Sequence, residues 1–200
     1  MSFNVVRFDD VKPQPWKNAG GVTRELLAWP NADDWVMRLS VADIEHDGPF
    51  SKFPGVDRWF AVLSGNGVRL GAPTKTIQYK DATFHFDGGI GSDCELIDGP
   101  TRDLNLMIRR DAANGWMKRV VAGFEFPHAD QGVTSSTARA PISGVFAVNE
   151  CTLRQSGSPV FFVEPMSLAW RTEPVGNGPS IRVDCCSSSA VFGFQCIVLK

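Results

Sequence analysis

The sequence predicts an all-β protein, and three observations support that fold class. No window of a dozen residues carries the apolar stripe at i, i+3 and i+4 that an amphipathic helix needs. Short β-branched and aromatic runs follow one another instead, separated by many of the 19 glycines and 13 prolines. Several runs also alternate polar and apolar residues at period two, which is typical of half-buried strands.

The expected strands follow from these runs in chain order. Residues 36–44 alternate, so one face of that strand is apolar and the other more polar. Residues 59–70 are expected to form two strands joined by a tight turn at Gly65–Gly67, where a positive φ costs little. Further strands are expected in residues 82–86, 94–98, 103–109, 119–126, 144–150, 159–164, 167–171, 180–185 and 190–199.

A faint internal similarity divides the chain into two halves. A Phe-Ala-Val strand, a hairpin and a Phe-rich strand occur in residues 58–89, and a similar series occurs in residues 144–165. A duplication of this kind implies two related barrels or sandwiches. We therefore expect an N-terminal domain over residues 1–114 and a C-terminal domain over residues 115–200.

Composition restricts the classes of function. The net charge of −2 gives no global support for nucleic-acid binding. The apolar runs are too short for a membrane span, and the N-terminus lacks the features of a signal peptide. Five cysteines without a C-x-x-C pair are typical of buried thiols in a cytoplasmic protein.

Motifs for metals and nucleophiles are missing from the sequence. The histidines His46, His85 and His128 are scattered and form no ligand set with each other or with cysteines. Neither a G-x-S-x-G nucleophile elbow nor a Walker phosphate loop occurs. We therefore expect no metal and no cofactor.

Residues 101–110 have a polar and an apolar face at period two. Three aliphatic side chains share one face, and Asp103 and Asn105 lie on the other. The polar face is either exposed to solvent or lines the inside of a small barrel, where it meets a ligand. The segment "MRLSVA" leaves the same two alternatives for Arg38 and Ser40.

The segment "PWKNAGGVTREL", residues 15–26, combines two cations, an amide and a glycine pair. The Arg24 guanidinium suits a carboxylate, Lys17 adds a mobile charge, and Asn18 both donates and accepts hydrogen bonds. The glycines allow a close approach to a ligand or simply form a turn. Alternatively, Glu25 pairs with one of the cations at a strand edge, which stabilises the fold by only about 0–1 kcal/mol.

A glycine- and proline-rich loop precedes a hydrophobic strand within residues 46–60. It delivers Asp57 and Arg58 to the start of that strand. The loop either forms a lid or a wall of a site, or these two residues only cap the strand.

These same segments resemble a known family. The blocks "PWKNAGGVTREL", "WVMRLSVADIEHDGPFSKFPGVDR", "LSGNGVRL", "FDGG" and "DGPTRDLNLMIRR" are similar to the signature blocks of the bacterial HutD/Ves family and occur in its order. The resemblance covers most of residues 8–110 and is weak over the last ninety. Ala19 departs from it, because the family more often has a third glycine there.

The resemblance implies a bicupin, with two small jelly-roll barrels and no histidine-rich metal motif. It also implies a non-enzymatic regulator of bacterial histidine utilisation that binds a small carboxylate, such as N-formylglutamate or urocanate, in the N-terminal barrel. With it, the site residues are expected to face inward: Lys17, Asn18, Arg24, Arg38, Ser40, Asp57, Arg58, Asp103 and Asn105.

Two other classes of function compete with this hypothesis. A metal-independent enzyme acting on the same kind of acid could use Asp103 and Lys17 for acid–base chemistry. A structural or adaptor protein would fill its barrel mouth with side chains. For the regulator, the expected partners are the carboxylate, a transcriptional repressor of the histidine-utilisation operon and a second copy in a homodimer, without direct contact to nucleic acid.

Overall fold

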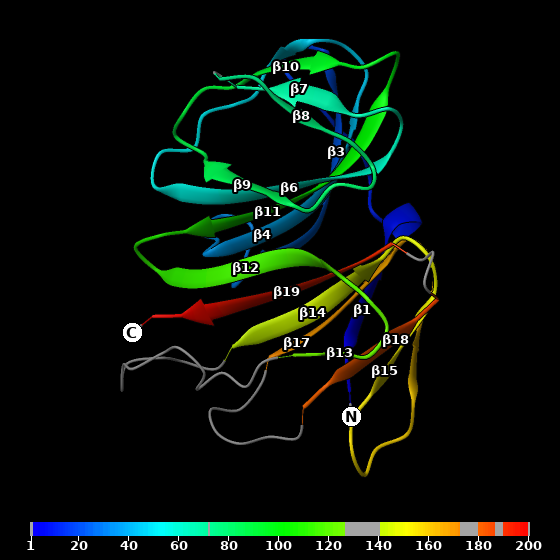
Figure 1. Ribbon diagram of the computed structural model, residues 1–200. Coiled ribbons are helices and arrows are strands. Elements are labelled where there is room, and N and C mark those ends of the chain that lie inside the picture. Colours follow the sequence, from blue (N-terminus) through cyan, green and yellow to red (C-terminus); the bar gives the residue numbers. More distant parts are fainter. Residues whose placement is uncertain (1, 72, 127–140, 173–179, 187–189, 200) are drawn as a thin grey trace. The chain divides into compact units, whose positions relative to one another are not determined.

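The computed structural model describes residues 2–71, 73–126, 141–172, 180–186 and 190–199, and it confirms the all-β prediction (Figure 1). The described residues form strands and one three-residue 3-10 helix, η1 (Phe8–Asp10). His128 lies outside the described residues. No helix among them has the length and apolar character that crossing a bilayer requires.

The chain divides into two compact units. One comprises Val11–Asp111, and the other combines Met1–Asp10 with Ala112–Lys200. The sequence-based division at residue 114 differs mainly at the N-terminus. Residues 1–10 join the second unit because β1 (Asn4–Arg7) pairs antiparallel with β17 (Ser167–Thr172).

The unit Val11–Asp111 contains two antiparallel sheets. The six-stranded sheet has the order β2 (Gln14–Pro15), β3 (Gly21–Trp29), β4 (Met37–Ile44), β11 (Thr101–Arg109), β6 (Val56–Ser64), β9 (Phe84–Asp87). The four-stranded sheet has the order β5 (Gly48–Pro49), β10 (Asp93–Leu96), β7 (Val68–Leu70), β8 (Lys75–Ile77). The alternating sequence runs form the longer strands, because each needs one face for a core.

An apolar core fills part of the space between these two sheets. Ile44, Phe60 and Val62 contribute to it from the six-stranded sheet, and Val68 and Leu70 from the four-stranded sheet. All five side chains are at most 1% exposed. This core packs the two sheets against each other.

The turn at Gly65–Gly67 lies where it was expected, but the hairpin does not form. β6 pairs with β11 and β9, whereas β7 pairs with β10 and β8. The chain therefore changes sheets at this turn. A side chain on Gly67 would overlap the backbone carbonyl oxygen of Ile77, so the crossover requires a glycine.

The second unit has the same two-sheet organisation. Its five-stranded sheet has the order β1, β17, β14 (Ile142–Ala147), β19 (Val191–Val198), β12 (Ala113–Val120). Its four-stranded sheet has the order β13 (Phe124–Glu125), β18 (Arg182–Cys185), β15 (Cys151–Arg154), β16 (Phe161–Val163).

The internal sequence similarity matches the structure only in its first part. Like β6 and β7, strands β14 and β15 follow each other from the larger sheet to the smaller one. The Phe-rich strands are not equivalent, because β9 pairs with β6 in a larger sheet and β16 pairs with β15 in a smaller one.

Candidate functional site

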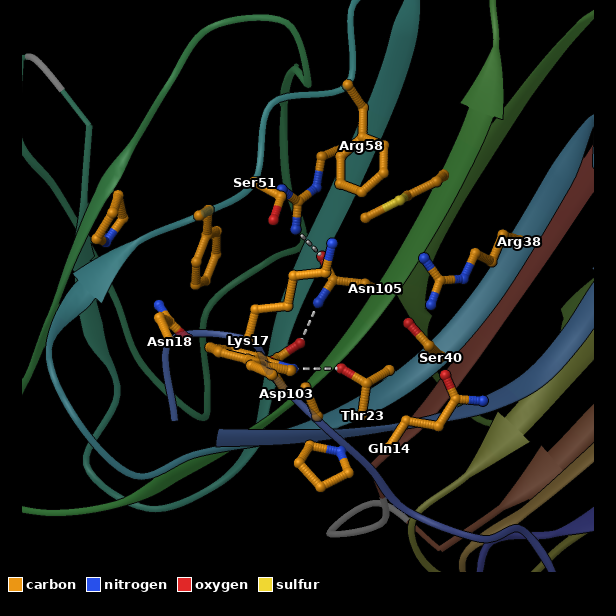
Figure 2. Close-up of a pocket in the computed structure, with 17 residues that line it drawn as sticks. Gln14, Lys17, Asn18, Thr23, Arg38, Ser40, Ser51, Arg58, Asp103 and Asn105 are labelled. Carbon is orange, nitrogen blue, oxygen red and sulfur yellow. Dashed lines mark hydrogen bonds between the residues drawn. The ribbon is translucent and has the colours of Figure 1, made fainter. Parts of the chain in front are cut away.

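A cavity of about 450 Å³ opens within the unit Val11–Asp111. It is lined by Gln14, Pro15, Trp16, Lys17, Asn18, Thr23, Arg38, Ser40, Ala42, Pro49, Phe50, Ser51, Phe53, Arg58, Asp103, Asn105 and Met107 (Figure 2). The lining combines cations, amides and hydroxyls with aromatic walls, which is the usual composition of a site for a small polar molecule.

Strand register brings the polar side chains of the six-stranded sheet to one face. Ser40 of β4 lies opposite Asn105 of β11, and Arg38 lies opposite Met107. Met107 in turn lies opposite Arg58 of β6. Directly paired residues point to the same side of a sheet, so these side chains share the cavity face.

The polar face of β11 therefore lines an interior. Asp103 is fully buried, and Asn105 is 5% exposed. Leu104, Leu106 and Ile108, on the other face of the strand, are buried too. Of the two alternatives that the sequence left open, the barrel-lining one holds for this strand.

The segment "PWKNAGG" forms the turn between β2 and β3 and brings Lys17 and Asn18 to the cavity. The Trp16 backbone N–H donates to the Gly21 carbonyl at 2.9 Å, which closes the turn. The Trp16 indole Nε1–H donates to Thr23 Oγ1 at 2.7 Å and holds the aromatic ring at the cavity wall. A Cβ on Gly21 would overlap the Asp43 carbonyl oxygen, so this glycine allows two strands to approach each other.

Arg58 occupies an aromatic enclosure. Its Cζ lies 5.1 Å from the ring centroids of Phe50 and Phe86 and 5.9 Å from that of Phe53. Its Nη2 donates to Asn105 Oδ1 at 2.8 Å. Burial lowers the pKa of Arg58 to about 10, with nearby Asp103 opposing the shift, so the guanidinium remains charged at neutral pH.

Asp103 completes a hydrogen-bonded chain with Arg58 and Asn105, drawn as dashed lines in Figure 2. Asn105 Nδ2–H donates to Asp103 Oδ1. The other carboxyl oxygen, Oδ2, is buried without a hydrogen-bond partner among the described residues. Burial raises the pKa of Asp103 well above its usual value, although nearby Arg58 and the Asn105 hydrogen bond oppose that rise.

The remaining cations differ in how their charges are balanced. Arg38 Nε lies 2.6 Å from Glu25 Oε2, so this pair is close to neutral. Within the part of the chain that the structure describes, neither Lys17 nor Arg58 forms an ion pair within 4 Å. Asp103 is the single carboxyl among the described lining residues. The cavity therefore favours an anion, because positive charge exceeds negative charge at its wall.

The structure brings most of the predicted site residues together, but not all. Seven of the nine line the cavity: Lys17, Asn18, Arg38, Ser40, Arg58, Asp103 and Asn105. Arg24 does not, and its Nη1 instead lies 3.2 Å from Asp43 Oδ2. Asp57 is also elsewhere, with its Oδ1 3.2 Å from Arg110 Nε and 3.4 Å from His85 Nε2. Glu25 does pair with a cation, but with Arg38 rather than Arg24 or Lys17.

Sequence reasoning missed the aromatic wall. Trp16, Phe50 and Phe53 line the cavity beside its polar groups. The sequence signal for the two phenylalanines is their place in the rigid "GPFSKFPG" loop just before Arg58. Gln14 also lines the cavity, and its sequence context gives no comparable signal.

No cluster of three or more His, Cys, Asp or Glu side chains that could hold a metal ion occurs among the described residues. The polar groups that converge in the cavity are nitrogen donors, hydroxyls and one carboxyl. This set suits hydrogen bonds to an organic anion.

A family model decides the relationship of the chain to known proteins. The model described as HutD matches residues 8–154, which cover the whole candidate site and extend into β15. The chain belongs to the HutD family. The match confirms the resemblance to HutD/Ves that the sequence blocks carry.

Curated relatives of this HutD family member have similar sequences. A protein of Pseudomonas putida, described as an uncharacterized 21.2 kDa protein in the hutC 3′ region, is 41% identical over 108 residues. That alignment covers 52% of this chain and 56% of the relative, so it spans little more than half of that protein. Protein Ves of Cronobacter sakazakii is 33% identical over 156 residues, which cover 72% of this chain and 81% of Ves.

Solved structures establish the same fold. HutD from Pseudomonas fluorescens SBW25 matches with a TM-score of 0.80 at 24% identity, over 100% of both chains. A cupin 2 conserved barrel domain protein from Leptotrichia buccalis matches with a TM-score of 0.53 at 13% identity, over 98% of this chain and 96% of that chain. With two sheets in each unit, these matches confirm the predicted bicupin class for this HutD family member.

Proposed function

We propose that this protein is a non-enzymatic, metabolite-sensing regulator of bacterial histidine utilisation that binds a small carboxylate in the cavity of the unit Val11–Asp111. Membership of the HutD family links the chain to histidine utilisation. The ligand class rests on the physical chemistry of the cavity. N-formylglutamate and urocanate are the acids to test first.

The Arg58 guanidinium is the observation that carries the proposal. It is 5% exposed, and it donates to a neutral amide, Asn105, rather than to a carboxylate. A buried cation without a close counterion is costly to maintain. An incoming carboxylate would offset that cost, and Arg58 Nε, which is buried and without a partner among the described residues, offers it a further donor.

The size and composition of the cavity fit such a ligand. Its volume of about 450 Å³ lies within the range of about 300–1,000 Å³ for small-molecule sites. A hydrogen bond from a charged donor contributes about 1.5–3 kcal/mol. Two such contacts, from Arg58 and Lys17, together with the apolar area of Trp16 and Phe50, are compatible with micromolar affinity, about −8 kcal/mol.

The regulatory part of the proposal concerns the relay to gene expression. Apart from η1, the described residues form no helix, so they include no recognition helix for DNA. Regulation is therefore proposed to act by removing an inducer from solution or by contact with a transcriptional repressor. A homodimer is part of the same proposal, and size measurements with and without ligand test it.

Isothermal titration calorimetry tests the binding proposal directly. N-formylglutamate and urocanate are titrated into the full chain, with their carboxamide analogues as matched controls that lack the negative charge. We expect micromolar binding of the acids and at least tenfold weaker binding of the amides. Equal affinity for acids and amides, or no heat with any acid, would contradict the proposal.

Prolonged incubation separates a sensor from an enzyme. Asp103 favours the second candidate function, because a buried carboxyl with a raised pKa is the kind of group that transfers protons in catalysis. The acids are incubated overnight with the protein, and the mixture is analysed for products. Unchanged acid supports the sensor, and product that is missing with Asp103→Asn supports the enzyme.

A further inference from the structure

Asp103 is a buried carboxyl group of the cavity with an incomplete set of hydrogen bonds. Its side chain is fully buried, and its Oδ2 has no hydrogen-bond partner among the described residues. An ionised carboxylate in that position lacks both solvation and a direct ion pair, which is a costly state. The same oxygen belongs to a residue that lines a cavity with the cations Lys17, Arg38 and Arg58.

The polarity of the hydrogen-bonded chain fixes which Asp103 atom can carry a proton. Arg58 has only donors, so the Asn105 oxygen must face it and the Asn105 amide N–H groups must face Asp103. Asp103 Oδ1 therefore accepts from Asn105. A proton on the carboxyl group resides on Oδ2, the atom without a partner.

The arrival of an anionic ligand strengthens the case for a neutral carboxyl group. Two like charges in one low-dielectric site cannot both be ionised without a large penalty. The alternative, an ionised Asp103 that accepts from an N–H of the ligand, leaves at least two negative charges near a single uncompensated guanidinium and the mobile Lys17. A neutral Asp103 avoids this repulsion and adds a donor to the cavity.

We propose that Asp103 acts as a neutral carboxylic acid in the complex and donates a hydrogen bond from its protonated Oδ2 to the bound carboxylate. Where Asp103 is ionised in the free protein, binding takes up one proton from the buffer. This inference rests on the proposed function. The proposal makes Asp103 a specificity-determining residue, because a protonated Oδ2 donates a hydrogen bond and therefore favours a ligand with an acceptor group, such as a carboxylate, at that position.

Other charged groups near Asp103 affect its pKa and so set the pH range in which ligand binding takes up a proton. Arg58 on β6 stabilises the ionised form, whereas Asp43 on β4 destabilises it. Cys94 on β10 remains a thiol because its pKa is raised to about 12. Lys17 on the β2–β3 turn is a further charged group of the lining, and so is Arg38 on β4, which pairs with Glu25 of β3.

Asp103→Asn is the matched variant, because its amide reproduces the proposed state. Its oxygen accepts from Asn105, so its NH₂ group takes the place of the protonated Oδ2. N-formylglutamate is the probe, since carboxylates of this kind titrate near pH 4 and stay ionised above about pH 5.5. Contributions from Arg58 and Lys17 are common to both proteins and cancel in the ratio of their affinities.

The experiment measures the affinity of wild type and Asp103→Asn for N-formylglutamate from pH 5.5 to pH 9. At pH 5.5 we expect the affinities of the two proteins to agree within about threefold. Above the pKa of Asp103, the affinity of wild type should fall relative to that of the variant by up to about tenfold per pH unit. Above the pKa of Asp103, calorimetry in buffers of different ionisation enthalpy should show proton uptake by wild type and none by the variant.

The two proposals fail in distinguishable ways. If urea unfolding shows that Asp103 ionises in the free protein within this pH range, a constant affinity ratio without proton uptake means that the inference about Asp103 is wrong, and carboxylate binding stands. If Asp103 stays neutral throughout the range, a constant ratio near one supports the inference. If the variant is folded but binds far more weakly at pH 5.5, Asp103 acts as an acceptor and the inference is also wrong. If wild type does not bind N-formylglutamate or urocanate at any pH, the proposed function fails and the inference fails with it.

Discussion

Arg24 Nη1 lies 3.2 Å from Asp43 Oδ2, and both side chains point away from the cavity. Their strand neighbours Thr23 and Ala42 do line the cavity, and consecutive side chains of a strand point to opposite faces. Arg102 Nε joins the cluster at 2.5 Å from Asp43 Oδ1. A guanidinium that looked suited to a ligand from sequence thus belongs to an ion-pair cluster outside the cavity.

Ligand affinity should depend on Arg58 and not on Arg24. Replacing Arg58 by Met removes a buried, charged donor, so we expect roughly 10- to 150-fold weaker binding of N-formylglutamate, from the loss of about 1.5–3 kcal/mol. Arg24→Ala should change affinity less than about twofold, because distant groups contribute almost independently. Calorimetry on both variants measures the difference.

Circular dichroism and thermal unfolding serve as the control for this pair, since Arg58→Met also leaves the Asn105 oxygen without its donor. A folded Arg58→Met protein with wild-type affinity would remove Arg58 from the site. A large loss of affinity in Arg24→Ala would return Arg24 to the ligand-binding set.

In the β2–β3 turn, removing a methyl group at Ala19 should stabilise the protein, whereas adding one at Gly21 should destabilise it. Ala19 has a φ of 57°, in the left-handed region that costs an L-residue about 1–2 kcal/mol. Glycine costs about 0.5–1 kcal/mol more chain entropy on folding, so Ala19→Gly should stabilise the protein by about 0.5–1 kcal/mol. Thermal unfolding should then show a midpoint about 2 °C higher.

Gly21→Ala is the control for this prediction. Its new Cβ would overlap the Asp43 carbonyl oxygen, so we expect a loss of about 1–3 kcal/mol from overpacking. A lower midpoint for Ala19→Gly, or an unchanged one for Gly21→Ala, would show that the turn has a different backbone from the one described here.

Period-two alternation predicts strands but cannot choose which face lines a site. In β11 the pattern separated Leu104 and Leu106 from Asp103 and Asn105, and the structure buries both faces. The choice depends on which strands flank β11 and on the second sheet that packs over it, and those contacts join residues far apart in the chain. The family resemblance supplied that information for Asp103 and Asn105, but it also suggested an inward-facing Arg24.

Strand neighbours in the sheets were equally hard to predict. The glycine turn after β6 has the composition of a hairpin, yet β7 joins the other sheet. Glycine in a turn lets the chain reverse direction at little energetic cost, but it does not determine which strands pair with each other. The short strands β2, β5 and β8 also escaped prediction, because two or three residues are too few to show a period. The longer strands β1 and β3 were not predicted either, and β12 covers residues 113–120 where a strand was expected over 119–126.

The stability of the protein should depend on pH through Asp103. The pKa of Asp103 is raised in the folded state, whereas in the unfolded chain Asp103 titrates near pH 4. Between these two pH values the native protein therefore binds more protons than the unfolded chain. The free energy of unfolding must therefore fall as pH rises through this window. Asp103→Asn lacks this titration.

Urea unfolding of wild type and Asp103→Asn from pH 4.5 to pH 8 measures this effect. We expect wild type to lose stability relative to the variant as pH rises, by at most about 1.4 kcal/mol per pH unit. A difference between the two proteins that is constant over this range, or that grows in favour of wild type, would contradict a raised pKa at Asp103.

The five cysteines should differ sharply in their reactivity toward a thiol reagent. Cys94, Cys151 and Cys196 are buried, and burial raises the pKa of each to about 12. At pH 8 only about one such thiol in ten thousand is ionised, and the thiolate is the reactive form. Cys185 is partly buried with a raised pKa, whereas Cys186 is exposed.

We therefore expect one rapidly modified thiol in the native protein and five after denaturation, measured with an aromatic disulfide reagent. Cys186→Ser should remove the rapid phase, and Cys185→Ser should leave it unchanged. Rapid modification of Cys94, Cys151 or Cys196 in the folded protein would show that the interior of the unit that carries this thiol is more accessible than its packing indicates.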